Sequence, residues 1–144
     1  MPNSESYHLE RFVEAQEGSY AGALGELRRG RKASHWIWYV FPQVAGLGRS
    51  FLAEKYAIQS REEAEAYLGH PVLGARLVEC AEALLGVEGK SVEEIMGYPD
   101  HLKLCSSMTL FAAVSPEGSV FGQVLERYYG GRVDERTLAF LRGR

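Results

Sequence analysis

Only one stretch of this 144-residue chain has the composition of a β-strand. The sequence "HWIWYVF" at residues 35–41 holds both tryptophans together with β-branched side chains, which favour strands. A strand needs a partner, because unpaired buried backbone polar groups are costly. We find no second convincing strand, and Pro42 cannot continue a ladder. We therefore interpret 35–41 as a short buried helix, and this interpretation commits the chain to an all-α fold.

Helix start signals recur along the rest of the chain. The sequences "SREE" at 60–63 and "SVEE" at 91–94 match a capping box, in which the serine accepts a free N–H and the glutamate reaches back. Further helix starts are suggested at Ser19, Ser50, Ser119 and Asp134. We expect one compact multi-helix bundle of about eight short helices over residues 8–144, preceded by a flexible tail at 1–7.

Composition excludes several classes of protein. The net charge is −3, so broad affinity for nucleic acid is not expected, although four cations lie within residues 28–32. Cys80 and Cys105 are too few for a disulfide framework. No apolar run approaches the roughly 20 residues that cross a bilayer, and the first residues do not resemble a signal peptide. We expect a cytoplasmic protein with no membrane partner, whose oligomeric state the sequence leaves open.

The strongest local anomaly is positive charge beside aromatic side chains. Lys32 closes the basic cluster, and Trp36 and Trp38 follow it within six residues. Cations offer phosphate contacts, and indole faces offer stacking surfaces. The alternative is structural, because cations at the C-terminus of a helix favour its dipole while they face water.

A glycine-containing turn follows the aromatic segment. In "GLGRS" at 46–50, Gly46 and Gly48 allow close backbone approach to a ligand, and Arg49 adds charge. Free N–H groups after Ser50 complete the chemistry of a phosphate cradle. The turn matches no established nucleotide-binding fingerprint. A plain connecting loop with a capping serine remains the alternative.

The third candidate is "DHLKLCSSM" at 100–108. On a helix, Lys103 faces Ser106 and Ser107 at spacings of three and four, and a lysine can activate a serine nucleophile. In the alternative, the serines are buried and bond carbonyls one turn back. His101 and Cys105 share a face, but two ligands do not make a metal site, so we expect no metal and no cofactor.

Several segments together resemble a known family. They are "LERFVEAQ", "SHWIWYVFPQ", "GLGRS", "HPVLGARL" and "DHLKLCSSMTLF". With them the chain resembles the bacterial family known as domain of unknown function 1810, sometimes mislabelled calpastatin, from about Leu9 to about Leu141. The resemblance implies a small, mostly α-helical, single-domain protein and assigns no role to any residue. Cys105 departs from the family pattern, so the resemblance supports neither a cysteine nucleophile nor a metal pair.

These observations predict a pocket where the aromatic segment, the glycine turn and the serine helix meet. Its ligand would be small and phosphorylated or nucleotide-like. The expected ligand-binding residues are Lys32, Trp36, Trp38, Gln43, Gly46, Gly48, Arg49, Ser50 and Ser106. The candidates for proton transfer are His35, Lys103 and Ser107. Whether the ligand is only bound, or is hydrolysed or used in group transfer, stays open. The alternative is a non-catalytic protein–protein interaction domain in which the same aromatics form the core.

Overall fold

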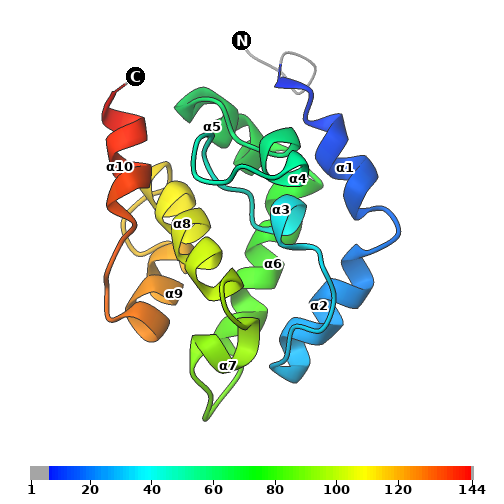
Figure 1. Cartoon of the computed structure of the whole chain (residues 1–144). Coiled ribbons are helices and arrows are strands. Elements are labelled where there is room, and N and C mark those ends of the chain that lie inside the picture. The colour runs from blue at the N-terminus through cyan, green and yellow to red at the C-terminus, as the bar shows by residue number, and fades with distance from the viewer. Residues whose placement is uncertain (1–6, 144) are drawn as a thin grey trace.

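The computed structural model describes residues 7–143, and over this range the chain forms ten helices and no β-sheet (Figure 1). In chain order they are α1 (Glu10–Gln16), α2 (Tyr20–Arg29), α3 (Ile37–Val40), α4 (Phe51–Lys55), α5 (Arg61–Gly69), α6 (Leu73–Leu85), α7 (Val92–Met96), α8 (Asp100–Ala113), α9 (Val120–Tyr129) and α10 (Glu135–Arg142). The predicted all-α fold is confirmed. The chain has two helices more than the expected eight over this range, and three of the ten have only four or five residues. The predicted tail lies, except for Tyr7, outside the described residues.

Side-chain caps begin four of the helices. Each capping serine accepts a hydrogen bond from the backbone N–H three residues later; these serines are Ser50, Ser60, Ser91 and Ser119. The capping box at 91–94 is complete. At 60–63 the box is half formed, because the Glu63 carboxylate instead accepts from the Gln59 N–H at 2.8 Å and pairs with Arg11 at 2.9 Å. Glu63 therefore ties the start of α5 to α1.

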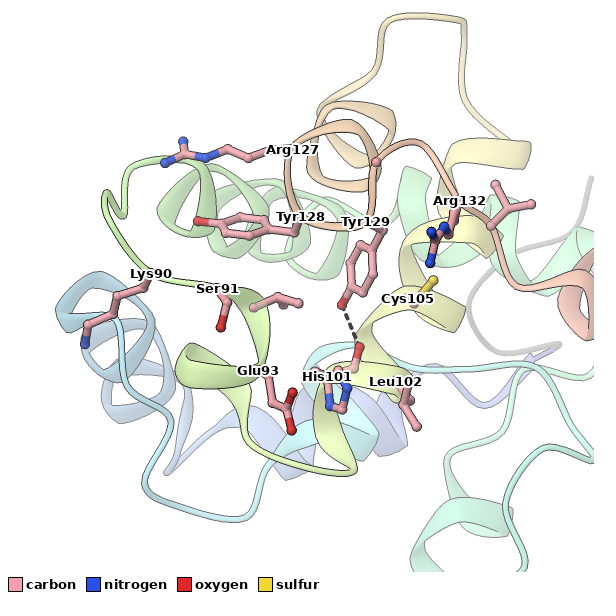
Figure 2. Close-up of a pocket in the computed structure, with 13 residues that line it drawn as sticks. Lys90, Ser91, Glu93, His101, Leu102, Cys105, Arg127, Tyr128, Tyr129 and Arg132 are labelled. Carbon is pink, nitrogen blue, oxygen red and sulfur yellow. Dashed lines mark hydrogen bonds between the residues drawn. The ribbon is translucent and has the colours of Figure 1, made fainter.

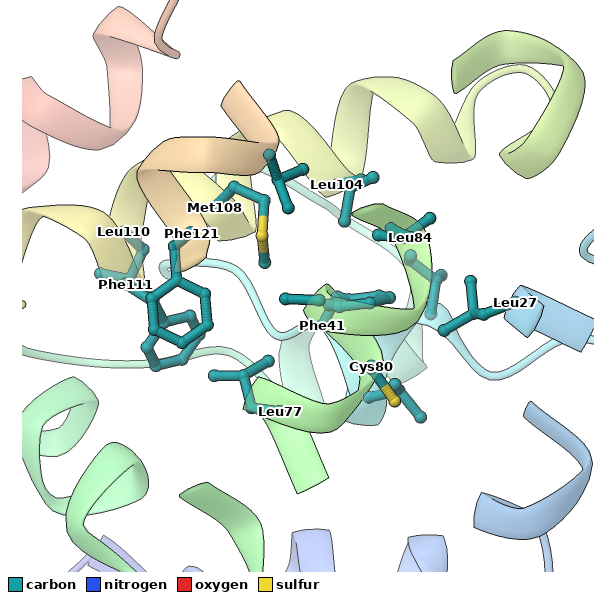
Figure 3. Packing of buried hydrophobic residues seen from close by; sticks show 14 of the residues in the cluster. Leu27, Phe41, Leu77, Cys80, Leu84, Leu104, Met108, Leu110, Phe111 and Phe121 are labelled. Carbon is teal, nitrogen blue, oxygen red and sulfur yellow. The ribbon is translucent and has the colours of Figure 1, made fainter. Parts of the chain in front are cut away.

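Helix α8 is the central element. It contacts α3, α5, α7, α9 and α10, and Figure 1 shows α9 and α10 on one side of it and α3 on the other. A helix that is apolar on nearly every side must be buried, and α8 buries seven residues between Leu104 and Phe111. Figure 3 shows its Met108 and Phe111 among Phe41, Leu77 and other side chains from distant segments. The core thus assembles around the segment that carries the predicted serines.

The segment 35–41 contains the predicted short helix, which is a single turn at Ile37–Val40 and so shorter than expected. Trp36 is 2% exposed, Phe41 is fully buried, and their ring centroids lie 6.2 Å apart. The turn sits against α1 and α8. Among residues 7–143, the one β-type pairing is an isolated parallel bridge between Val44 and Ile58, just after this segment. Its aromatic content reflects burial, not membership of a sheet.

Within residues 7–143, no helix combines the length and apolar character that crossing a membrane requires.

Candidate functional site

The glycine turn and α8 enclose a small hollow of about 310 Å³, which we call the α4–α8 pocket. Its lining residues are Gln43, Leu47, Gly48, Arg49, Ser50, Ala53, Pro99, Leu102, Lys103, Ser106 and Arg136. Six of the twelve residues singled out from the sequence line it, namely Gln43, Gly48, Arg49, Ser50, Lys103 and Ser106. The fold therefore brings the glycine turn and the serine helix together.

The start of the turn is held by two backbone hydrogen bonds to Ile58. The Ala45 N–H donates to the Ile58 carbonyl at 2.9 Å, and the Ile58 N–H donates to the Gln43 carbonyl at 2.8 Å. Gly46 has a φ of +94°, which side chains with a Cβ rarely adopt. A Cβ on Gly48 would lie 2.6 Å from the Ala53 Cβ. The two glycines thus allow the turn and its close approach to α4, so they are explained without a ligand.

Lys103 reaches the pocket from α8 and is partly shielded from solvent. Its side chain is 31% exposed, and its Nζ lies 3.8 Å from Asp100 Oδ1 and 5.7 Å from the centroid of the Trp38 ring. The stronger partner of Asp100 is Lys32, whose Nζ lies 2.7 Å from Oδ2. Because Lys32 already neutralises this carboxylate, the charge of Lys103 is only partly compensated.

Ser106 lies on the floor of the pocket beside the C-terminal segment. Its Oγ donates to Asp134 Oδ2 at 2.8 Å, and the Thr137 hydroxyl donates to the same oxygen at 2.6 Å. Burial alone would raise the pKa of the Asp134 carboxyl, but the hydrogen bonds from Thr137 and Ser106 and the charge of Arg136 together lower it. Asp134 therefore stays ionised, and the Ser106 proton is committed to it.

Arg136 is the residue that sequence reasoning missed. It lies on α10, and its Nε is 3.4 Å from Asp134 Oδ1, while its side chain remains 69% exposed. It reaches the pocket because α10 packs on α8. Nothing in its local sequence distinguishes it from other surface arginines, so only the fold could reveal it.

Some predicted residues serve the fold and do not line the pocket. The Lys32 side chain is 5% exposed, pairs with Asp100 and lies 4.9 Å from the Trp36 ring centroid. Trp36 is buried, and its Nε1 donates to Glu26 Oε1 at 2.8 Å. Ser107 is fully buried, and its Oγ has no hydrogen-bond partner among the described residues. These positions are closed to a ligand.

Three others lie outside the lining of the pocket. His35 and Gly46 are exposed, and Trp38 is half-buried behind Lys103. The Trp38 Nε1 atom is buried and has no hydrogen-bond partner in the described part of the chain. The expectation that His35 converges with Lys103 and Gln43 on one pocket therefore fails, because the His35 side chain faces solvent.

The loop between α2 and α3 is organised by Glu26, a second residue that sequence reasoning missed. Its carboxylate accepts hydrogen bonds from the Ala33 and Ser34 N–H groups, the Ser34 hydroxyl and the Trp36 indole, at 2.6–3.0 Å. Burial would raise the pKa of this carboxyl, but these bonds outweigh burial and lower it from 4.5 to about 2. Residues 33–36 are thereby fixed to α2.

A larger hollow of about 860 Å³ lies along a neighbouring face of α8, and we call it the α7–α9 pocket (Figure 2). Its lining residues are Lys90, Ser91, Val92, Glu93, His101, Leu102, Cys105, Arg127, Tyr128, Tyr129, Gly130, Arg132 and Val133. The Tyr129 hydroxyl donates to the His101 carbonyl at 2.6 Å. Burial raises the pKa of the Cys105 thiol, so this sulfur is not an activated nucleophile.

His101 and Cys105 face this pocket together, as their spacing predicts. Among the described residues, no group of three or more histidine, cysteine, aspartate or glutamate side chains could hold a metal ion.

Comparison with known proteins agrees with this fold. The chain is similar to the crystal structure of the conserved hypothetical protein Rv1873 from Mycobacterium tuberculosis, with 54% sequence identity and a TM-score of 0.91. The alignment covers 93% of this chain and 96% of that one. No curated protein matches the chain significantly. The model of the family described as "Protein of unknown function (DUF1810)" matches residues 6–141, nearly the whole length. The chain therefore belongs to the DUF1810 family.

Proposed function

We propose that the α4–α8 pocket binds the phosphate group of a small phosphorylated ligand. The observation that carries this proposal is the meeting of three cations from separate segments: Arg49 on the turn, Lys103 on α8 and Arg136 on α10. Arginine and lysine are the side chains that recognise phosphate most strongly. A hollow of about 310 Å³ lies at the lower end of the range of small-molecule pockets, so it suits a small phosphorylated ligand.

The nearby carboxylates compensate this charge only in part. Asp100 does not line the pocket and is paired with Lys32. Asp134 accepts hydrogen bonds from the hydroxyl groups of Ser106 and Thr137. Arg49 forms no ion pair within the described residues, and Lys103 and Arg136 have only long contacts of 3.8 and 3.4 Å to carboxylates. An arriving phosphate can therefore draw all three cations toward itself. Ser50 and Gln43 add neutral polar groups at the rim.

The proposal is one of binding, and it assigns no chemical step. The Ser106 proton is held by an ionised carboxylate, and the Ser107 hydroxyl is sealed in the core. No histidine lines the α4–α8 pocket as the described residues form it. Asp134, the carboxylate bonded to Ser106, has a lowered pKa and is therefore a weak base toward an attacking nucleophile.

Removal of two of these charges tests the proposal. In the variant Lys103→Met with Arg136→Gln, the Kd for inorganic phosphate should rise by at least about a hundredfold, because each of the two lost charge-assisted contacts contributes about 1.5–3 kcal/mol. Methionine keeps the stem of Lys103 packed near Trp38. Isothermal titration calorimetry gives the Kd, and thermal shift confirms that the variant is folded.

The matched control is Arg31→Gln, which removes an exposed cation that belongs to the basic cluster but lies outside the pocket. Its Kd should equal that of the wild type. If the wild-type protein binds no phosphate, or if the control weakens binding as much as the double variant, the assignment to this pocket is wrong.

A further inference from the structure

We infer that the ligand has a second part, an aromatic ring that lies across Leu102 in the α7–α9 pocket while its phosphate occupies the α4–α8 pocket. The ligand class is therefore a nucleoside phosphate. This inference rests on the proposed function, since it takes the phosphate position from it. The observation behind it is that Leu102 lines both hollows and is 50% exposed.

The geometry of α8 explains why the two hollows adjoin. Successive residues of a helix turn by about 100°, so Lys103 and Ser106 share one face and His101 and Cys105 share the next. The first pair lines the α4–α8 pocket, and the second pair lines the α7–α9 pocket. Leu102 lies between these faces. A ligand whose phosphate is held at Lys103 can thus extend across the Leu102 side chain into the α7–α9 pocket.

The walls of the α7–α9 pocket suit a flat ring with polar edges. Val92 and Val133 supply apolar surface, and Figure 2 shows the Tyr129 ring projecting toward His101. Aromatic side chains stack well on nucleobases, because every base has a flat π-face. The hollow of about 860 Å³ exceeds what phosphate alone requires, so it has room for a base and its sugar.

The polar groups of this pocket divide into two sets. Arg127 donates to the Leu85 and Val87 carbonyls, and Tyr129 donates to His101, so these groups are already used by the fold. The side chains of Glu93 and Arg132 form no hydrogen bond or ion pair with the described residues. The Glu93 carboxylate offers hydrogen-bond acceptors and the Arg132 guanidinium offers donors, and the edge of a nucleobase requires both. Both are exposed, so binding need not break an existing bond.

Filling the larger hollow tests the inference. Val133 is 37% exposed and lines the α7–α9 pocket, and Val133→Trp places an indole there. The matched control is Val72→Trp, because Val72 is 38% exposed and lines neither pocket. Isothermal titration with inorganic phosphate, ribose 5-phosphate and adenosine monophosphate gives three Kd values for each protein.

We expect the wild type to bind adenosine monophosphate at least tenfold more tightly than phosphate or ribose 5-phosphate. Val133→Trp should abolish this preference and leave the phosphate Kd within twofold, while Val72→Trp changes neither. Glu93→Ala, at an exposed position, should reduce the preference as well and serves if the tryptophan variant does not fold.

The outcomes separate the two proposals. Phosphate binding with no preference for the nucleotide overturns this inference alone, as does a preference that survives in both Val133→Trp and Glu93→Ala. Equal affinity for ribose 5-phosphate and adenosine monophosphate would mean that the aromatic ring does not contribute to binding, which also overturns this inference. If the wild type binds no phosphate, the proposed function is wrong. The inference then fails as well, because it takes the position of the phosphate from that function.

Discussion

Replacement of Glu26 with Gln should lower the free energy of unfolding at pH 7 by about 3 kcal/mol. Four donors from Ala33, Ser34 and Trp36 meet this carboxylate, and hydrogen bonds to charged groups contribute about 1.5–3 kcal/mol each. Glutamine offers one acceptor oxygen, and its NH₂ group faces N–H and O–H donors. The side chain is only 7% exposed, so water cannot readily replace the lost partners. Urea unfolding followed by circular dichroism measures the difference.

The effect should depend on pH in a defined direction. The pKa of Glu26 is lowered to about 2 in the folded protein, against an ordinary value of 4.5. Its contribution to stability is therefore complete above about pH 4.5 and is lost as pH falls from there toward 2. The difference in unfolding free energy between wild type and Glu26→Gln should shrink over this interval.

The matched control is Glu14→Gln at an exposed position on α1, which should change stability by less than about 0.5 kcal/mol at pH 7. A Glu26→Gln deficit that stays constant between pH 7 and pH 3 would mean that the carboxylate charge is not what stabilises the loop.

Gly74→Ala should be comparably disruptive. Gly74 is buried near the start of α6, and an added Cβ would lie only 2.0 Å from the Leu68 carbonyl oxygen. The contact is with backbone, so α5 and α6 must separate to admit one methyl group. Overpacking of this kind costs about 1–3 kcal/mol and occasionally more, and we expect about 3 kcal/mol because no flexible side chain can give way.

Gly22→Ala on α2 is the control for this experiment. It is also a glycine within a helix, but nothing lies within 4 Å of its added Cβ. Alanine there should raise the unfolding free energy by up to about 1 kcal/mol through helix propensity alone. Opposite signs for the two substitutions in urea unfolding are the expected result, and equal stability of Gly74→Ala and wild type would contradict the close α5–α6 contact.

Local signals were enough to predict most of the fold. Capping residues such as Ser50 and Ser91 identify helix starts because their effect needs only neighbouring backbone. The start of α6 at Leu73 has no such capping serine. There the His70 Nδ1 accepts the Val72 and Leu73 N–H groups, so the imidazole acts as the cap. The expected number of about eight helices was two too low, although the short helix α3 was itself predicted.

The candidate site was less accessible to sequence reasoning. Gly48, Lys103 and Ser106 were recognised because their residue types suit ligand chemistry, and the fold places them around one hollow. Trp36 and Lys32 share those residue types, but they are occupied by Glu26 and Asp100, which carry no local signal of that role. Pairing of this kind depends on tertiary contacts. The position of Arg136 in the lining of the α4–α8 pocket depends on them too.

The different surroundings of the two tryptophans have a practical consequence for spectroscopy. Trp36 is locked to Glu26 in the interior, so its fluorescence should follow unfolding of the whole chain. Trp38 lies behind Lys103, so its emission should respond when that ammonium group moves toward a bound anion. A Trp36→Phe protein would thus retain Trp38 as its single tryptophan, and the emission of this side chain would report anion binding in the α4–α8 pocket without any attached dye.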